Sequence, residues 1–405
     1  MPHARSFDTP GDKRVLIVGC GITGPVLALF LRGCGFEPVL YEARDEPDDA
    51  AGSFLNLGPN GRSVLESLGI AEEVLRAGEP TTHLVFANHR GRTIGRNPER
   101  TTVIKRGLLN KGLRQAAEEA GVPVEFGKRL VRVDQDGPRR VTARFADGTT
   151  ARGALLVGAD GINSATRAAV FPEAPAPSFT QGIGSGGFAR TKGAGEADGV
   201  LRMVFGLRGF FGYQVLPGGE VYWFENHTET VEPAKGWAAS ITDDQWRDDL
   251  LRRHAADHRV VAGILRATEG PIGRWPLYDL PSLPTWHRQN VCLLGDAAHA
   301  ISPHLGQGAA LGMEDAVVLA KCLRDEADPA RAFAAFEGIR RPRVEGLVRR
   351  ARRTGGHMTP NGPVGRALRD LMLPFFLRLS VKSADDVYGY RVAWDADAPD
   401  HAAAR

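Results

Sequence analysis

The chain has 405 residues, which is long enough for two domains or for one large domain with an insertion. Its 51 basic and 48 acidic residues give a net charge of +3, a near balance that does not indicate a nucleic-acid or membrane-surface partner. Hydrophobic residues make up 42% and charged residues 24%, as in an ordinary soluble globular protein. No apolar run is long enough to span a bilayer, and the polar stretch 1–14 lacks the apolar core of a secretory signal.

The first predicted unit is a strand, a glycine loop, a helix and a second strand. The apolar β-type run 15–18 is followed by a G-x-G-x-x-G loop made by Gly19, Gly21 and Gly24. In such a loop the first glycine turns tightly, the second lets a pyrophosphate approach the backbone, and the third lets the helix pack on the strand. The helix expected from Thr23 to about Gly33 directs its free N–H groups and the positive end of its dipole toward the phosphate.

Glu42 comes directly after the second predicted strand, Pro38–Tyr41. At the tip of this strand a carboxylate can accept hydrogen bonds from two ribose hydroxyls. The unit therefore predicts a dinucleotide site, although it does not say which dinucleotide binds. The alternative is a βαβ unit that binds no ligand.

The predicted secondary-structure pattern changes twice in the middle of the chain. Short β-like pieces over 81–102 indicate strands of a second sheet, and a helical pattern follows over 103–120. The apolar strand Ala154–Val157 then runs into Asp160 and Gly161. From about residue 178 to 280, alternating apolar and aromatic residues predict an antiparallel sheet, with one helical interlude over 242–254.

A second candidate cofactor segment begins at residue 290. Asp296 follows the apolar strand Val291–Leu294, where a carboxylate can hydrogen-bond the hydroxyls of a polyol. Gly306 and Gly308 precede a predicted helix, whose N-terminus stabilises an anion such as a reduced isoalloxazine ring. A polyol acceptor beside an anion-binding helix end suits a flavin better than a nicotinamide. The alternative is a buried aspartate that only caps a helix.

Four motifs occur in the order GCGITG, IKRGLLNKGL, GADGINSATR and GDAAHAISPHLGQGAALGMEDA. Together they resemble FAD-dependent aromatic hydroxylases, the para-hydroxybenzoate hydroxylase type of flavoprotein monooxygenase, and in particular the salicylate-hydroxylase-like branch. The likeness covers about residues 14–350. It implies an α/β fold, α+β overall, in which a glutathione-reductase-like, Rossmann-type FAD domain carries an inserted antiparallel β-sheet substrate domain and C-terminal helices.

The expected domain boundaries follow from this resemblance and from the changes of pattern. The FAD-binding domain is expected to be discontinuous, over residues 1–80, 101–177 and 281–350. The substrate-binding sheet domain would comprise 81–100 and 178–280. A C-terminal helical segment would occupy 351–395, and 396–405 would form a disordered tail, since it is rich in Ala and Asp.

The resemblance also implies roles for individual residues in FAD binding. Glycine-loop residues would hold the pyrophosphate, Glu42 the adenosine ribose, Asp296 the ribityl chain, and the segment around Gly306 the isoalloxazine. The full set of expected cofactor-binding residues is Gly19, Gly21, Ile22, Thr23, Gly24, Glu42, Ala43, Arg44, Arg106, Leu130, Asp160, Gly161, Asp296, Pro303, Gly306, Gln307, Gly308, Ala309 and Ala310. Many family members carry an asparagine after the second glycine of the G-x-G; here Ala309 and Ala310 stand, so that side-chain contact is absent while the backbone contacts are unaffected.

The residues that act on substrate are less clearly marked. His304, between Pro303 and the glycine pair, is a candidate proton acceptor from a phenol, or alternatively a residue that shapes the loop. Candidate substrate contacts on the predicted sheet are Tyr213, Gln214, Tyr222 and Phe224, although aromatic residues at strand alternation are equally typical of a core. No metal site is expected, because His254 and His258 lack further ligands at suitable spacing.

The predicted function is a single-component FAD-dependent monooxygenase that uses NAD(P)H and O2 to hydroxylate an aromatic or polycyclic small molecule through a flavin hydroperoxide. FAD would be bound tightly and non-covalently, and NADH versus NADPH stays open. Alternatives are a flavin-dependent epoxidase or Baeyer-Villiger-type oxygenase on a larger polycyclic or isoprenoid natural product, a nicotinamide-only dehydrogenase, and a non-catalytic escort of lipids or prenyl groups. We expect a monomer or homodimer without nucleic-acid or integral membrane association.

Three further expectations concern the cysteines and the C-terminal part. Four cysteines without C-x-x-C spacing (Cys20, Cys34, Cys292 and Cys322) indicate reduced packing thiols in a cytoplasmic protein. The basic run Arg340–Arg353 is expected to form a solvated helix face, with a partner or NADPH-phosphate role as the alternative. The apolar segment Leu371–Leu379 is expected to be core or a contact surface.

Overall fold

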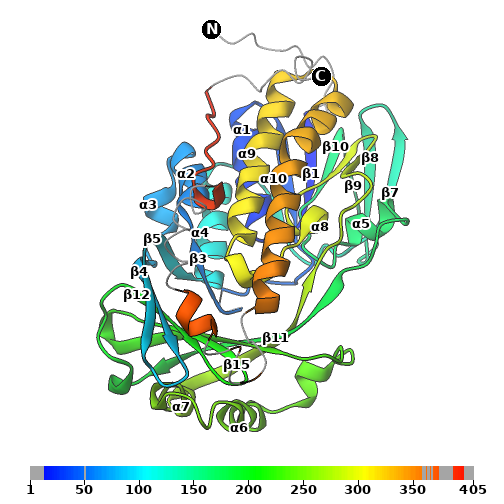
Figure 1. Cartoon of the computed structure of the whole chain (residues 1–405). Coiled ribbons are helices and arrows are strands. Elements are labelled where there is room, and N and C mark those ends of the chain that lie inside the picture. Colours follow the sequence, from blue (N-terminus) through cyan, green and yellow to red (C-terminus); the bar gives the residue numbers. More distant parts are fainter. Residues whose placement is uncertain are drawn as a thin grey trace.

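The computed structural model describes residues 13–49, 52–357, 362, 365, 368–373 and 386–395. Within these residues the strands form a six-stranded sheet, an eight-stranded sheet and a three-stranded sheet. Figure 1 shows the six-stranded sheet and its helices above the eight-stranded sheet. The described part of the chain contains no helix long and apolar enough to cross a membrane.

The six-stranded sheet has the order β16-β17-β10-β1-β2-β6. Its strands are β1 (Arg14–Val18), β2 (Glu37–Tyr41), β6 (Val124–Glu125), β10 (Leu155–Gly158), β16 (His287–Arg288) and β17 (Val291–Leu293). All neighbours pair in parallel except β16 with β17. Because helices cover one face of this sheet and the three-stranded sheet packs on the other, the central strand β1 is continuously apolar, and Val15 to Val18 are at most 4% exposed. The carboxyl ends of β1, β2 and β10 meet at one edge, where the glycine loop begins.

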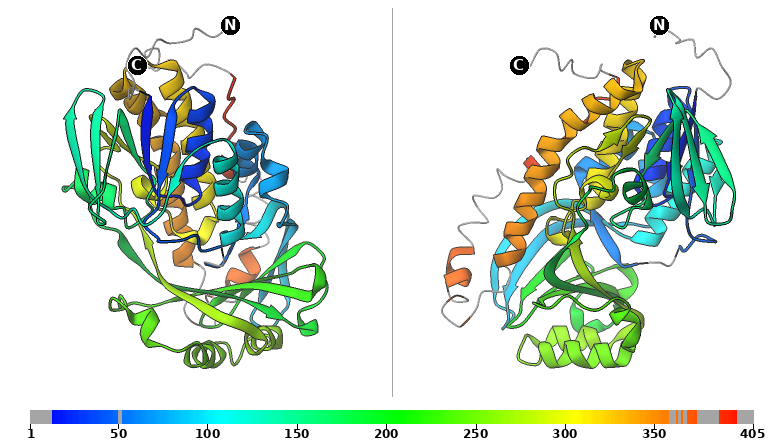
Figure 2. Two further views of the ribbon diagram at one scale, coloured as in Figure 1. Left: turned by 180° about the vertical axis from the view of Figure 1, so that it is seen from behind. Right: turned by 90° about the vertical axis from the view of Figure 1, so that its right-hand side faces the viewer.

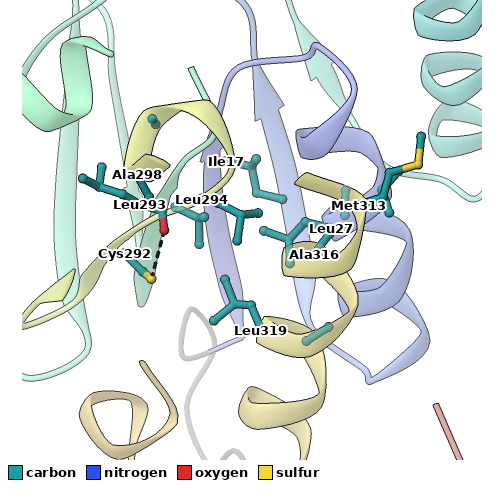
Figure 3. Packing of buried hydrophobic residues seen from close by; sticks show 14 of the residues in the cluster. Ile17, Leu27, Cys292, Leu293, Leu294, Ala298, Met313, Ala316 and Leu319 are labelled. Atoms are coloured by element: carbon teal, nitrogen blue, oxygen red, sulfur yellow. Dashed lines mark hydrogen bonds between the residues drawn. The ribbon is translucent and has the colours of Figure 1, made fainter. Parts of the chain in front are cut away.

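Helices pack against this sheet and form most of the main core with it. They are α1 (Thr23–Gly33), α2 (Pro59–Ser67), α3 (Ala71–Val74), α4 (Arg106–Glu119), α5 (Ala165–Val170), α8 (Asp296–His299), α9 (Gly308–Asp325) and α10 (Pro329–His357). Figure 3 shows Ile17 of β1, Leu27 of α1 and Leu319 of α9 in the buried cluster between the sheet and the helices. This packing fixes the N-termini of α1 and α9 close to the carboxyl ends of the strands.

The eight-stranded sheet has the order β15-β11-β14-β13-β12-β4-β5-β3. Its strands are β3 (Phe54–Leu57), β4 (Glu79–Asn88), β5 (Thr93–Lys105), β11 (Ser178–Arg190), β12 (Val200–Phe205), β13 (Phe210–Val215), β14 (Glu220–Thr228) and β15 (Thr268–Asp279). The sheet is antiparallel except for the β4–β12 pair. Helices α6 (Asp243–Arg253) and α7 (Arg259–Arg266) cover its outer face, as both views in Figure 2 show.

Smaller elements complete the described chain. The three-stranded sheet joins β7 (Leu130–Gly137), β8 (Arg140–Phe145) and β9 (Thr150–Gly153). The 3-10 helices are η1 (Lys192–Ala194), η2 (Pro217–Gly219), η3 (Trp237–Ser240) and η4 (Pro303–Leu305). All four cysteines are free, as expected.

Three expectations need correction or comment. The helix predicted from Val103 begins at Arg106, because 93–105 pairs as strand β5. Strand β3 pairs with β5 in the eight-stranded sheet, although the sequence places residues 1–80 in the FAD-binding domain; the other domain boundaries stay a prediction. Most of Leu371–Leu379 and all of 396–405 lie outside the described residues, and Leu371 itself is 74% exposed, so it is not a core residue.

The prediction of a solvated face for Arg340–Arg353 is wrong at its first residue. Arg340 is fully buried and ion-paired with acidic side chains of α9. The pattern of charge along α10 did not reveal this, because the partners lie on another helix and are themselves buried.

Candidate active site

A single cavity of about 2370 Å³ runs from the glycine loop to the inner face of the eight-stranded sheet. The expected cofactor residues that line it are Gly19, Gly21, Ile22, Thr23, Glu42, Ala43, Arg44, Arg106, Leu130, Asp160, Gly161, Asp296, Pro303, Gly306, Gly308 and Ala309. His304 and Phe224 also line it. Of the expected site residues, Gly24, Gln307, Ala310, Tyr213, Gln214 and Tyr222 are not part of its lining. Tertiary packing thus gathers the expected cofactor residues from six separated stretches of chain around one space.

The glycine loop has no room for side chains at two of its three glycines. A Cβ at Gly19, where φ is +108°, would lie 2.4 Å from the carbonyl oxygen of Ala159, and a Cβ at Gly24 would lie 2.1 Å from that of Gly19. Gly21 has no atom within 4 Å of such a Cβ, so its backbone is open to the cavity. Helix α1 begins at Thr23 without a side-chain cap or an acidic residue in its first turn, which leaves N–H groups free to bind a phosphate.

Glu42 is held in place at the end of β2. Its Oε2 accepts a hydrogen bond from the backbone N–H of Cys20 at 3.0 Å, and its Oε1 accepts one from the backbone N–H of Arg44 at 3.1 Å. These bonds fix the carboxylate beside the glycine loop. Carboxylate oxygens have further lone pairs, so Glu42 can still accept hydrogen bonds from a ribose.

Asp160 organises the turn after β10. Its Oδ1 accepts a hydrogen bond from the Ser164 hydroxyl at 2.5 Å, and its Oδ2 accepts from the N–H and the hydroxyl of Thr166 at 2.9 and 3.0 Å. Burial raises the pKa of Asp160 against these hydrogen bonds. Its side chain therefore shapes the loop at the cavity wall.

Arg167, which the sequence prediction did not single out, connects α5 with α8. Its Nη1 donates to the carbonyl of Ala297 at 2.8 Å, next to Asp296, and its Nη2 donates to the carbonyl of Ile162 at 2.5 Å. Burial lowers the pKa of this guanidinium. Its place at the end of the GADGINSATR motif was the available signal.

Asp296 begins α8 and lines the cavity, with no hydrogen bond from its side chain to any other described residue. Burial raises the pKa of this carboxyl group, and the nearby His299 and Arg106 oppose the rise. An unpaired carboxyl group in a confined site needs hydrogen-bond donors, and polyol hydroxyls supply them.

The segment 306–310, which leads from η4 into the first turn of α9, divides its residues between the cavity and the interior. Gly308 and Ala309 line the cavity, whereas Gln307 is fully buried and its Oε1 accepts a hydrogen bond from Asn60 Nδ2 at 2.9 Å. Ala310 is 1% exposed and its Cβ lies 3.2 Å from where a Cβ of Gly61 would be. The loop thus offers backbone, not the Gln307 or Ala310 side chain, to the cavity.

A buried polar network behind this loop was also missed by the sequence prediction. Asn60 Nδ2 donates to Glu314 Oε1 at 2.6 Å, and Glu314 pairs with Arg340 and with Arg343 at 2.7 and 2.9 Å. The adjacent Asp315 pairs with Arg340 at 2.6 Å. The only signal in the sequence was a pair of acidic residues inside the apolar stretch of α9.

Asp315 also anchors the loop that carries Asp296. It accepts hydrogen bonds from the backbone N–H of Gly295 at 3.1 Å and from His299 Nε2. Burial would raise the pKa of Asp315, but His299 and Arg340 hold it below its usual value. His299 therefore anchors the loop.

The far end of the cavity is formed by the eight-stranded sheet. Of the four expected substrate contacts only Phe224 lines it. Tyr222 instead packs on Phe54 and Phe188, with ring centroids 5.3 and 4.9 Å apart. Gln214 accepts a hydrogen bond from the Thr81 hydroxyl at 2.7 Å.

Tyr213 belongs to the core between the sheet and its covering helices α6 and α7. Strand alternation puts it on the opposite face from Gln214, and sequence alternation alone could not identify the inner face.

His304 lies on η4 and lines the cavity. Its Nδ1 lies 3.0 Å from the hydroxyl of Ser302, and no described residue bonds its Nε2. Burial lowers the pKa of this imidazole, so it is neutral near pH 7 and its free nitrogen can accept a proton. No group of His, Cys, Asp and Glu side chains in the described residues could hold a metal ion.

Comparison with known proteins agrees with this arrangement. The family model described as "FAD binding domain" matches residues 12–351. The chain is 32% identical over 395 residues to salicylate hydroxylase of Pseudomonas putida, covering 89% of each chain. It is 30% identical over 358 residues to aurachin C monooxygenase/isomerase of Stigmatella aurantiaca, covering 84% of this chain and 88% of the relative.

Among solved structures, HpxO of Klebsiella pneumoniae in complex with FAD and uric acid superposes with a TM-score of 0.82 at 25% identity, over 92% of this chain and 96% of that one. The predicted fold class is confirmed by these similarities and by the sheets described above. The open backbone at Gly21, the fixed carboxylate of Glu42 and the unpaired carboxyl group of Asp296 fit FAD. The chain therefore belongs to the FAD-binding-domain family of flavoprotein monooxygenases, and it is an FAD-dependent hydroxylase.

Proposed function

We propose that this enzyme hydroxylates an electron-rich aromatic carbon of a multi-ring or substituted aromatic small molecule, with NAD(P)H and O2 as co-substrates. One observation carries the proposal: the cavity that is lined by Gly21 and Asp296 is also lined by His304 and by aromatic residues of the eight-stranded sheet. Its volume of about 2370 Å³ exceeds the roughly 1,000 Å³ that encloses a drug-sized ligand. Such a space suits FAD together with a separate aromatic substrate.

The cofactor end would be held as follows. Backbone N–H groups at the start of α1 would bind the pyrophosphate, and Glu42 the adenosine ribose. Asp296 would bind the ribityl hydroxyls, with Arg106 beside it. The backbone at Gly308 and Ala309 would face the isoalloxazine. When bound, FAD supplies the redox chemistry, taking electrons from NAD(P)H and activating O2.

His304 would act on the substrate. A phenol becomes a better nucleophile at its ring carbons when it loses its proton, and a neutral imidazole nitrogen can accept that proton. Ser302, whose hydroxyl meets Nδ1, would orient the ring so that Nε2 faces the substrate. The apolar walls would keep water from the reacting groups.

Similar proteins support an aromatic substrate. Their names refer to salicylate, aurachin C and, for a relative from Mycolicibacterium vanbaalenii, urate. These molecules differ in size and charge, so the names support the substrate class and not one compound. We further propose a monomer or homodimer in the cytoplasm; four free thiols support a reducing compartment.

The function is tested with purified holoenzyme and a panel of phenols, aromatic acids, indoles and polycyclic ketones. Substrate should stimulate NADH or NADPH oxidation, and product formed under ¹⁸O2 should gain the mass of one labelled oxygen atom. Stimulated oxidation that yields only hydrogen peroxide with every member of the panel, or product that carries oxygen from water, would contradict the proposal.

A further inference from the structure

The sheet end of the cavity has an apolar and aromatic wall with a charged side chain packed on one of its rings; Glu99, Arg100 and Arg350 are further charged residues of the cavity lining. The wall includes Phe86, Met203, Phe205, Phe210, Phe224 and Leu373, which pack as one cluster. The charged side chain is Arg369, which lines the same cavity. It belongs to segment 368–373, the short orange helix beside β4 and β12 in Figure 1.

The Arg369 side chain is fixed on two sides. Its Nε and Nη2 both donate to Asp370 Oδ1, at 3.0 and 2.7 Å, and Asp370 Oδ2 accepts from Asn88 Nδ2 at 3.1 Å. The guanidinium carbon lies 4.6 Å from the centre of the Phe205 ring. Asn88 itself holds the β4–β5 turn by accepting hydrogen bonds from the N–H groups of Arg90 and Arg92, each at 3.1 Å. The guanidinium is therefore tied to the sheet and not free to swing.

One nitrogen of this fixed group has no hydrogen-bond partner among the described residues. The Arg369 side chain is 9% exposed, and its Nη1 is buried without a hydrogen bond to any other described residue. A buried donor without an acceptor costs about 1–3 kcal/mol. At the wall of a ligand cavity, an acceptor atom on the ligand can remove this cost.

The surroundings decide what kind of acceptor fits. Asp370 already balances the charge of Arg369, so a carboxylate placed at Nη1 would leave a net negative charge among aromatic and aliphatic walls. A carbonyl oxygen satisfies the N–H group and adds no charge. We propose that Arg369 is a specificity-determining residue that donates from Nη1 to a neutral carbonyl oxygen, as in a ketone or amide, on the aromatic substrate. This inference rests on the proposed hydroxylase function and narrows its substrate class.

Three ligands that share one ring system test whether Arg369 prefers a neutral carbonyl, a carboxylate or neither. They are 1-naphthol, its 4-acetyl derivative and its 4-carboxylate. Their dissociation constants are measured from the change in flavin absorbance of oxidised holoenzyme without NAD(P)H. We expect the acetyl compound to bind about 10-fold more tightly than 1-naphthol, and more tightly than the carboxylate. Because this measurement needs no turnover, it stays informative if the ¹⁸O2 experiment fails.

The variant Arg369→Met keeps an apolar side chain of similar length and removes the donor. It should weaken binding of the acetyl compound about 10-fold and change 1-naphthol by less than about 2-fold. Arg96→Met is the matched control, because Arg96 is an exposed arginine on β5 outside the cavity lining and its loss should change neither constant. A second variant, Asp370→Asn, keeps an oxygen for Arg369 but removes the balancing charge, so it should shift the preference toward the carboxylate.

Three results would overturn the inference. One is a wild-type enzyme with no preference for the acetyl compound over 1-naphthol. Another is an Arg369→Met variant with normal FAD content that binds 1-naphthol and the acetyl compound equally more weakly than the wild type. That result would mean that Arg369 has only a packing role. The third is a wild-type preference for the carboxylate that Arg369→Met removes, which would assign an anionic substrate instead.

Discussion

At the scale of single residues, the cofactor end of the cavity uses few side chains and much backbone. Glu42 and Asp160 are held by hydrogen bonds within the protein, whereas the Asp296 carboxyl group has no such bond in the described chain. This difference supports the proposal that Asp296 contacts the ligand directly, whereas Asp160 shapes the loop. Two substitutions test the roles proposed for single residues.

The first substitution is Asp296→Ala. A lost hydrogen-bonding acceptor of this kind costs about 1.5–3 kcal/mol, so the dissociation constant for FAD should rise roughly 10- to 100-fold. Flavin fluorescence titration of apoenzyme measures it. Asp244→Ala on α6, where the carboxylate side chain is 88% exposed, is the control and should retain normal affinity. Unchanged flavin content in Asp296→Ala would argue against its proposed role.

The second substitution is His304→Ala. If the imidazole accepts the substrate proton, hydroxylation should fall about 10²- to 10⁴-fold while NAD(P)H oxidation falls much less. The imidazole accepts a proton only when it is neutral. Because burial lowers its pKa, the acid limb of the kcat/KM profile for the wild type should lie below the ordinary value of about 6.5. Equal loss of both activities would indicate a positioning role.

At the scale of elements, α9 and α10 are joined by buried charges that also anchor the loops of the cavity. Arg340 of α10 meets Glu314 and Asp315 of α9, and Asp315 holds the N–H of Gly295 ahead of Asp296. The network links helix packing to the position of a ligand-facing residue. Breaking one member leaves a buried charge unpaired, which is far more costly than losing a surface pair.

Arg340→Met should therefore destabilise the protein by about 3–5 kcal/mol, measured by urea unfolding. The matched control is Arg349→Met on the same helix, whose side chain is 63% exposed and lies 3.7 Å from Glu345. That control should change the free energy of unfolding by no more than about 0.5 kcal/mol. A similar decrease in the free energy of unfolding in both variants would show that any arginine substitution on α10 destabilises the protein, whether or not it breaks the buried network.

At the scale of the whole molecule, a second buried charge cluster joins the eight-stranded sheet to its outer helices. His254, directly after α6, has its Nδ1 2.7 Å from Asp257 Oδ2 and its Nε2 3.5 Å from Glu225 Oε1 on β14. Glu225 also pairs with His227, whose Nδ1 lies 3.0 Å from Glu225 Oε2. Burial by itself would lower the pKa of His254, but Asp257 and Glu225 raise it to about 9. The cluster therefore makes the stability of this layer depend on pH.

The direction of this pH dependence follows from the raised pKa of His254. Protonated His254 favours the folded state, so its contribution is complete below the unfolded pKa of about 6.5 and disappears as pH rises through about 9. We expect the free energy of unfolding to fall by on the order of 2–3 kcal/mol between pH 6.5 and pH 9.5, measured by urea unfolding. His254→Gln should flatten this decline. A wild-type stability that is constant or rises over this range would contradict the assignment.

The sequence by itself determined the cofactor half of this protein. The glycine loop with Glu42, and Asp296 before Gly306 and Gly308, are local patterns, because each places its ligand-facing atoms within a few residues of one strand end. The family, the flavin and the order of the main elements follow from such local patterns and from their likeness to known hydroxylases.

Only the tertiary structure decided which side chains face the substrate space. Period-two alternation shows that Tyr213 and Gln214 lie on opposite faces of a strand, but not which face is inner. Arg369 is the clearest example, because its contact with Phe205 and the hydrogen bond of the neighbouring Asp370 with Asn88 depend on a segment far along the chain folding back onto β4 and β12. Likewise Gln307, in a loop that the pattern assigned to the flavin, is turned inward by Asn60, 247 residues earlier. Long-range contacts of this kind leave no periodic trace in a sequence, so local reasoning reached the cofactor and not the substrate.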